Sequence, residues 1–158
     1  MINYISNIIK TFLFFLFLFS NFQIVLATNY YVSTTGSNPG TPDDISNPFS
    51  TLQYIFDNYN LDPGDSIIIA NGIYSEHSLS PSNDDNGYAI CGSDSSTTIF
   101  NGNGTVNYWM KVDQSINDNW TITDLTIREY KYDYQGTLLI SHGCTGVILS
   151  NLHFYKNH

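Results

Sequence analysis

Two seven-residue segments of this 158-residue chain resemble each other, and their spacing restricts the fold more than any other feature. TITDLTI (121–127) aligns with ILSNLHF (148–154), 27 residues later, so that apolar residues fall on apolar residues and Asp124 falls on Asn151. A period in the twenties is typical of a solenoid, because one coil cannot bury its own apolar face whereas stacked coils can. The sequence therefore predicts stacked coils, with Asp124 and Asn151 forming a polar ladder at a sharp bend.

The segment TIFNG (98–102) is a weaker third copy, in which Ile99 aligns with Ile122 and Asn101 with Asp124. Other short strand-like runs are separated by Asn-Gly and Gly turns, a pattern that also suits an antiparallel sandwich. A sandwich does not explain the 27-residue self-similarity, so we favour stacked coils. The remaining runs are SIIIA (66–70), YAICG (88–92), YWMKV (108–112) and TLLI (137–140).

One amphipathic helix is expected before these runs. Ser50 and Gln53 have the spacing of a capping box, and the helix should end near Asn60, before a Pro-Gly turn. Its apolar stripe would cover an open end of the sheet. The stripe consists of Leu52, Ile55, Phe56 and Tyr59.

Residues 1–27 are typical of a signal peptide. Lys10 precedes an apolar run at Phe12–Phe19 that is short for a membrane span, and Val25-Leu26-Ala27 suits cleavage after Ala27. The alternative is an uncleaved membrane anchor. We therefore expect a secreted, extracellular protein with no membrane contact after cleavage.

The mature chain is strongly acidic. Without Lys10 it keeps four basic and fourteen acidic residues, a formal charge of −10. Nucleic acids and anionic membranes need basic patches, so neither is an expected partner. A polyanionic ligand would need a cation to intervene.

Two cysteines and two glycosylation sequons lie in the mature chain. Secretion permits a disulfide between Cys91 and Cys144, although both lie in apolar runs where thiols are commonly buried. Asn103 and Asn119 each begin an Asn-x-Thr sequon and are candidate glycan acceptors or ordinary turn residues.

The segment from Tyr30 to Glu76 contains the sequences YVS (31–33), GT (40–41), PF (48–49) and PGDSIIIANGIYSE (63–76). With these motifs it resembles the opening segment of secreted right-handed parallel β-helix proteins of the pectate-lyase-like superfamily, and is most similar to family-nine pectate lyases. The resemblance implies an all-β solenoid with an N-terminal capping helix. The expected boundaries are 1–27 for the signal peptide, 28–65 for the strand, loop and helix, and 66–158 for coils that end mid-coil, as in an N-terminal fragment.

A lyase of this superfamily typically uses Lys or Arg as the base, with a cation to neutralise the substrate carboxylate. Asp84 and Asp85 could supply oxygen ligands to calcium, although their segment is typical of a solvated turn. Arg128 is expected to form an ion pair with Glu129 or a neighbouring coil. The other basic residues of the mature chain are Lys111, Lys131 and Lys156.

EYKYDYQG (129–136) is the main candidate for contact with carbohydrate. In an extended conformation Tyr130, Tyr132 and Tyr134 would share one face, suited to stacking on sugar rings. The alternative is that these rings pack back on the solenoid. His153 aligns with Thr126 and should face solvent.

The sequence thus favours a secreted β-helix module that contacts a polysaccharide or a cell-surface glycan, without a complete active site in this stretch. The alternative is the N-terminal part of a calcium-dependent, pectate-type polysaccharide lyase, and only that alternative would require a cofactor, Ca²⁺. The residues themselves do not decide whether the protein is an enzyme.

Overall fold

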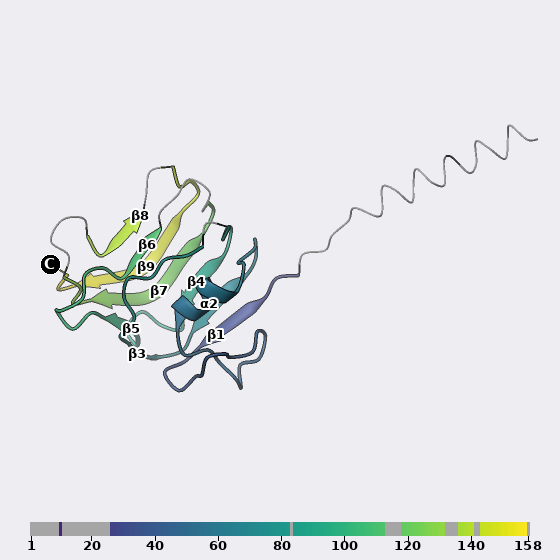
Figure 1. Ribbon diagram of the computed structural model, residues 1–158. Coiled ribbons are helices and arrows are strands. Elements are labelled where there is room, and N and C mark those ends of the chain that lie inside the picture. Colours follow the sequence, from purple (N-terminus) through teal and green to yellow (C-terminus); the bar gives the residue numbers. More distant parts are fainter. Residues whose placement is uncertain are drawn as a thin grey trace, which may run out of the picture.

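The computed structural model describes residues 10, 26–82, 84–112, 118–131, 136–140 and 143–157. These residues form one short helix and a series of short strands (Figure 1). The elements are β1 (Asn29–Val32), α2 (Leu52–Asn58), β2 (Ser66–Ile69), β3 (Gly72–Tyr74), β4 (Ala89–Gly92), β5 (Thr98–Asn101), β6 (Met110–Val112), β7 (Thr121–Arg128), β8 (Leu138–Ile140) and β9 (Ile148–Tyr155). No helix in this part of the chain is both long and apolar enough to cross a membrane.

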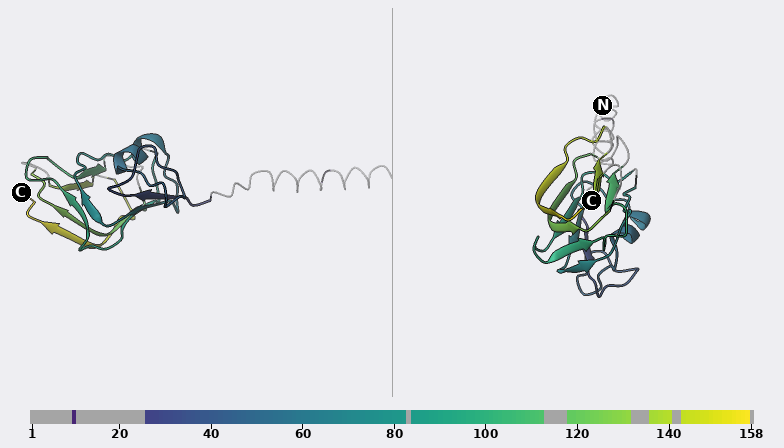
Figure 2. Two further views of the ribbon diagram at one scale, coloured as in Figure 1. Left: turned by 90° about the horizontal axis from the view of Figure 1, so that it is seen from below. Right: turned by 90° about the vertical axis from the view of Figure 1, so that its left-hand side faces the viewer.

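The strands stack as a parallel β-helix. One face carries β1, β2, β4 and the first half of β7, a second carries β3, β5 and the second half of β7, and β6 pairs with β8 on a third. Every one of these pairings is parallel, which excludes the antiparallel sandwich. Figures 1 and 2 show α2 near the β1 end of the stack and β9 at the other end.

The 27-residue repeat is confirmed by the register of β7 and β9. Their pairing runs from Thr121 opposite Ile148 to Arg128 opposite Tyr155. The predicted alignment of the third copy, residues 98–102, is however wrong. Ile99 lies opposite Thr126, and Asn101 opposite Arg128, because the turn 93–97 splits this coil into β4 and β5 and displaces the bend from Asn101.

Inward side chains form columns through the stack. Ile67, Ile90 and Ile122 lie in register on the first face and are fully buried. On the second face the Tyr74 and Phe100 rings are stacked, with centroids 5.2 Å apart. Burying one large apolar side chain contributes about 1.5–3 kcal/mol, so these columns supply the main driving force for stacking.

The predicted polar ladder at the bend is confirmed. Asp124 and Asn151 have φ angles of 59° and 47°, and Asn151 Nδ2 donates to Asp124 Oδ1 at 2.5 Å. The pair of residues directly before them in β7 and β9 continues the ladder, as Ser150 Oγ donates to Thr123 Oγ1 at 2.9 Å. The Asn151 amide and then the Thr123 hydroxyl lower the pKa of Asp124. Asp and Asn tolerate the left-handed backbone that turns each strand onto the second face.

The helix is capped differently from the prediction. Thr51, not Ser50, is the N-cap residue, and its side chain accepts from Tyr54 N. Gln53 does not complete a capping box, since its side chain bonds to Asp57 and Ser80 instead. The carboxylate of Glu76, from the first coil, accepts from Leu52 N at 3.0 Å and Gln53 N at 3.1 Å. A distant acidic residue thus satisfies the first-turn donors that a local Gln or Glu would otherwise partner.

Replacing Glu76 should loosen the helix from the solenoid. We expect Glu76→Ala to lower the free energy of unfolding by about 2 kcal/mol, because two backbone donors lose their acceptor. Asp57→Ala, on the exposed side of α2, is the matched acidic control and should change stability by less than about 0.5 kcal/mol. Urea denaturation followed by circular dichroism measures both, and equal effects of the two substitutions would contradict this role.

The same carboxyl should impose a pH dependence. Burial raises the pKa of Glu76 above its ordinary value of 4.5, and the bonds from Leu52 and Gln53 only partly oppose this shift. The folded state therefore binds the proton more tightly than the unfolded state, and this contribution to stability is full below pH 4.5 and lost as the pH rises through the raised pKa. The stability advantage of the wild type over Glu76→Gln should accordingly shrink as the pH rises above 4.5 and through the raised pKa.

Candidate functional site

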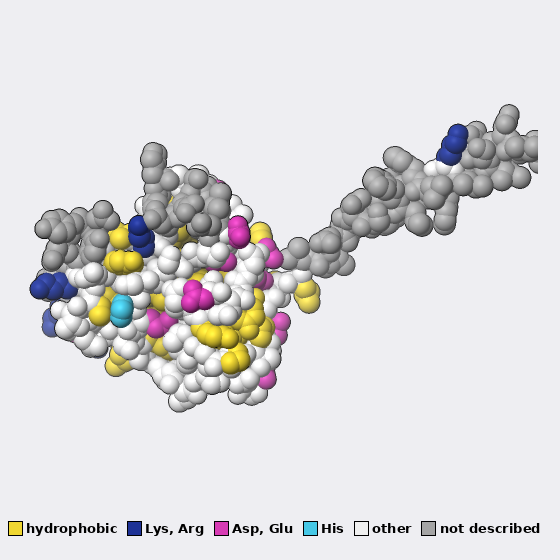
Figure 3. All heavy atoms as spheres, viewed as in Figure 1, with side chains coloured by type: hydrophobic (Ala, Val, Ile, Leu, Met, Phe, Trp, Pro, Cys, Tyr) yellow, Lys and Arg dark blue, Asp and Glu magenta, His cyan; other side chains and the backbone are white. Residues whose placement is uncertain are grey.

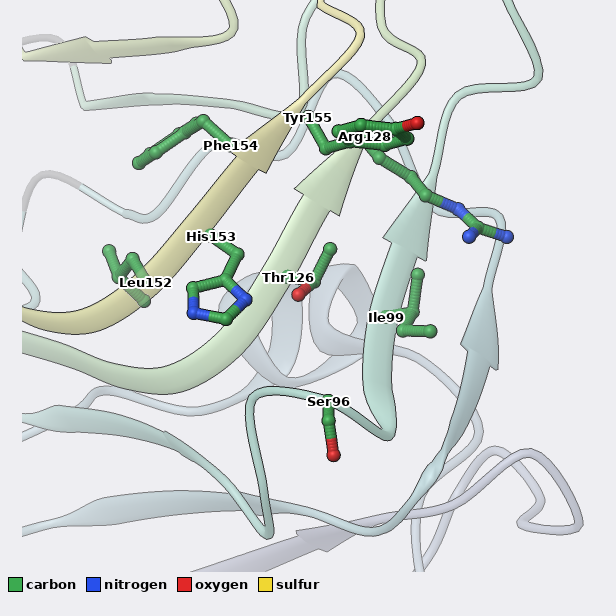
Figure 4. Close-up of a pocket in the computed structure, with 8 residues that line it drawn as sticks. All are labelled: Ser96, Ile99, Thr126, Arg128, Leu152, His153, Phe154 and Tyr155. Atoms are coloured by element: carbon green, nitrogen blue, oxygen red, sulfur yellow. The ribbon is translucent and has the colours of Figure 1, made fainter.

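A groove runs across the outer surface of the second face, with a volume of about 580 Å³ (Figure 4). We call it the lateral groove. Side chains from three successive coils and from the turn 93–97 form it. Its lining residues are Ser96, Ile99, Thr126, Arg128, Leu152, His153, Phe154 and Tyr155.

Strand register places the functional side chains of the lateral groove. Ile99, Thr126 and His153 lie opposite one another on β5, β7 and β9 and form one outward row. Arg128 and Tyr155 form the next outward pair. Alternation along each strand turns these residues away from the core. His153 is exposed, as its alignment with Thr126 predicted.

Arg128 brings a positive charge to the lateral groove without the expected ion pair. Its Nε atom is buried and has no hydrogen-bond partner, and no salt bridge joins it to Glu129 within the described part of the chain. Glu129 has a φ of 58°, so the chain turns away from the direction of β7 at this residue. Its backbone N–H donates to Tyr155 O at 3.1 Å. In Figure 4 the Tyr155 ring lies beside the stem of the Arg128 side chain, whose guanidinium reaches past β5.

The turn 93–97 forms a fixed rim of the lateral groove. Thr126 Oγ1 donates to Ser95 O at 2.6 Å, and Ser95 Oγ donates to Asn151 Oδ1 at 3.4 Å, so the turn is tied to both later coils. Within the turn, the backbone N–H and the hydroxyl of Ser96 both donate to Asp94. These bonds are the main cause of the lowered pKa of Asp94, and the nearby His153 adds to the shift.

Charge is distributed unevenly over the molecule. On the face seen in Figure 3, Lys and Arg side chains of the folded part lie toward the β9 end, and Asp and Glu side chains lie toward the centre and the β1 end. Arg128 lines the lateral groove, and the Lys156 ammonium lies 5.2 Å from the centroid of the Tyr155 ring. Arg128 and Lys156 thus bring positive charge to the β9 end, and the Asp94 carboxylate that Ser96 contacts lies at the rim of the groove.

The structure removes Tyr130 from the candidate carbohydrate contacts. Its side chain is fully buried, and its hydroxyl donates to the backbone oxygen of Glu76 at 2.5 Å. The Tyr130 ring follows Glu129, which has a left-handed backbone, and it turns inward. Tyr132 and Tyr134 lie outside the described residues.

Neither cysteine forms a disulfide. Cys91 and Cys144 are both present as thiols. Cys91 lies on the outer face of β4, one residue after the inward Ile90, whereas Cys144 packs against the core, so the two side chains face different environments. The sequon residues Asn103 and Asn119 are both exposed and have positive φ angles, 53° and 57°.

The acidic turn at Asp84 and Asp85 does not present two outward carboxylates. Asp85 is fully buried and accepts from Leu61 N at 2.9 Å and Ser82 N at 2.7 Å, so it stabilises the backbone. Among the described residues, no group of three or more His, Cys, Asp or Glu side chains is arranged to hold a metal ion.

Sequence reasoning missed the lateral groove as a site, although part of the signal was present. The 27-residue alignment already placed His153 over Thr126, and the strand register extends it to Tyr155 opposite Arg128. Ser96 carries no such signal, because the turn 93–97 has no counterpart in the next coil. Only the folded chain shows that this turn borders the groove.

Tyr130→Phe tests the structural role of Tyr130. Loss of the bond to Glu76 O should lower the free energy of unfolding by about 1 kcal/mol, measured by urea denaturation. The substitution should leave carbohydrate binding unchanged, because the ring is buried. Unchanged stability combined with weaker sugar binding would restore Tyr130 as a ligand contact.

Comparison with known proteins adds little to this geometry. No family model matches the chain, and no similar curated protein is found. A solved structure with a similar fold is a pectin methylesterase mutant in complex with a hexasaccharide, at 15% sequence identity and a TM-score of 0.49. The match covers 82% of this chain and 50% of that chain, so the chain spans about half the length of the matching structure.

Proposed function

We propose that this protein is a secreted β-helix module that binds an acidic carbohydrate in the lateral groove. The observation that carries the proposal is the Arg128 side chain, which lines the groove beside Tyr155 and forms no ion pair within the described residues. A guanidinium binds a carboxylate through two parallel hydrogen bonds, which suits a sugar acid better than a neutral sugar.

The other lining residues suit the remainder of a sugar. Tyr155 is 53% exposed, so its ring is available to stack on the C–H face of a sugar ring. Thr126 and Ser96 already donate their hydroxyl protons to Ser95 O and Asp94, so their oxygens are available to accept from sugar hydroxyls. A volume of about 580 Å³ lies within the range of small-ligand sites.

We expect the ligand of the lateral groove to be a polysaccharide or a cell-surface glycan. This proposal includes secretion after cleavage at Ala27 and glycan attachment at Asn103 and Asn119, both of which are exposed. The net charge of the mature chain opposes nonspecific binding of polyanions. Recognition therefore depends on local contacts with Arg128 rather than on the overall field.

The enzymatic alternative is a calcium-dependent lyase similar to family-nine pectate lyases. Arg128 is the observation that favours it, because this superfamily typically uses Lys or Arg to remove the proton beside a substrate carboxylate. The alternative requires calcium to be held when substrate is present, whereas the binding module does not require it.

Arg128→Gln should weaken binding of trigalacturonate by about tenfold or more, measured by isothermal titration calorimetry, because the carboxylate loses its charged partner. Arg128→Lys should lose a smaller part of the affinity. The matched control is Lys131→Ala, a basic residue that is exposed and does not line the groove.

Equal loss of affinity in Arg128→Gln and Lys131→Ala would contradict the assignment to the groove. Polygalacturonate should be bound without release of products that absorb in the ultraviolet, in calcium and in chelator alike. Calcium-dependent release of unsaturated products would overturn the module and establish the lyase.

A further inference from the structure

A second groove, which we call the loop groove, lies on the outer surface of the first face and has a volume of about 310 Å³. Tyr31 of β1 and Ile68 of β2 lie opposite each other and form its floor. Ile45 and Pro48, from the loop 33–49, form a wall. Ile45 is 74% exposed, so its side chain is accessible at the edge of the groove.

Backbone hydrogen bonds hold the loop 33–49, which forms the wall of the loop groove, against β1. Phe49 N donates to Tyr31 O at 2.7 Å, and Ser33 N donates to Phe49 O at 2.9 Å, so the loop returns onto β1. At Gly36 a Cβ atom would lie 2.2 Å from Phe49 O, a contact that no other residue could accept. The wall is therefore held in place before any ligand arrives, which lowers the entropy cost of binding.

Hydroxyl groups of the loop groove are oriented as acceptors. Ser46 Oγ donates to Asp44 Oδ1 at 2.6 Å, and Ser93 Oγ donates to Ile69 O at 2.9 Å. Ser33 and Thr35 share a further hydroxyl hydrogen bond at 3.1 Å. Ser46 and Ser93 use their hydroxyl protons within the protein, so these two oxygens can accept, whereas the Ser33–Thr35 pair keeps one proton to donate.

We propose that the loop groove binds a neutral hexose residue. No charged side chain lines it among the described residues, and the Asp44 carboxylate beside Ser46 disfavours an acidic ligand. A neutral sugar supplies hydroxyl donors for the serine oxygens and an apolar C–H face for Tyr31. This site is separate from the lateral groove and has the opposite charge preference.

The test titrates the full-length secreted product with cellotriose and follows backbone amide shifts by NMR. Shifts should be confined to the loop groove, and Tyr31→Ala should weaken binding by about tenfold. If Tyr31→Ala does not fold, Ile45→Asp serves instead, because Ile45 is mostly exposed and the new charge would sit beside Asp44. The control is Ile73→Ala, an exposed aliphatic residue of β3 outside this groove.

Binding that Ile73→Ala weakens as much as Ile45→Asp would overturn the site, and so would the absence of shifts at about 10 mM cellotriose. Trigalacturonate titrated in parallel separates the two proposals. Loss of its binding with cellotriose binding intact contradicts only the lateral groove, and the reverse contradicts only the loop groove.

A different observation concerns the start of the folded chain. Thr28 N donates to Asp65 Oδ1 at 2.7 Å, and Asp62 N donates to Asp65 Oδ2 at 3.0 Å. Asp65 is only 4% exposed, whereas Leu26 is 82% exposed and Ala27 is also exposed. In the described segment that starts at Leu26, hydrogen bonds to the fold begin at Thr28, and the bond before it is accessible to a peptidase.

We further infer that the Asp65 carboxylate binds the amino terminus that signal-peptide cleavage creates at Thr28. Hydrolysis of the Ala27–Thr28 peptide bond by a signal peptidase, with water, leaves a carboxylate on Ala27 and an α-ammonium on Thr28. The donor beside Asp65 then carries a positive charge, and charge-assisted hydrogen bonds are about twice as strong as neutral ones. Processing thus stabilises the junction between β1 and the first coil.

Mass spectrometry of the secreted product should show Thr28 as its first residue. Inserting Gly-Ser between Ala27 and Thr28 moves the new ammonium away and should lower the Tm by about 4 °C. In an Asp65→Asn background the same insertion should change the Tm by less than about 1 °C. A different first residue, or equal shifts in both backgrounds, would overturn the inference.

Discussion

The in-register pairing of parallel strands is the constraint on which the rest of the structure depends. Because strands pair residue by residue, each position has the same inward or outward orientation in successive coils. The buried isoleucine column and the outward row of Ile99, Thr126 and His153 are two results of this rule. Stability and the lateral groove therefore have a common origin, since a shift of one residue would exchange core and surface.

Acidic side chains stabilise the backbone of this fold. Glu76 accepts from the first turn of α2, Asp65 accepts at the start of β1, and Asp85 accepts within a buried turn. Each carboxylate accepts from a segment that is distant in the sequence. Asp65 and Asp85 also accept from a residue three positions earlier, within a tight turn. Part of the strongly negative charge is therefore structural.

The two grooves differ in chemistry because they lie on different faces of the stack and mainly on different coils. The turn 93–97 lies between them, with Ser93 lining the loop groove and Ser96 lining the lateral groove. One groove offers a guanidinium, and the other offers only hydroxyl oxygens and apolar surface. A solenoid keeps its core constant while loops and outward positions vary, so binding sites can be added without altering the stack.

The sequence by itself determined the coil repeat, the polar ladder of Asp124 and Asn151, and the outward position of His153, because strand register converts sequence spacing directly into spatial neighbours. Tertiary structure alone decided the inward turn of Tyr130, the capping of α2 by Glu76 and the presence of Cys91 and Cys144 as free thiols. These features depend on left-handed residues and on contacts between distant segments. No periodicity encodes such contacts, because each arises from the path of one particular loop.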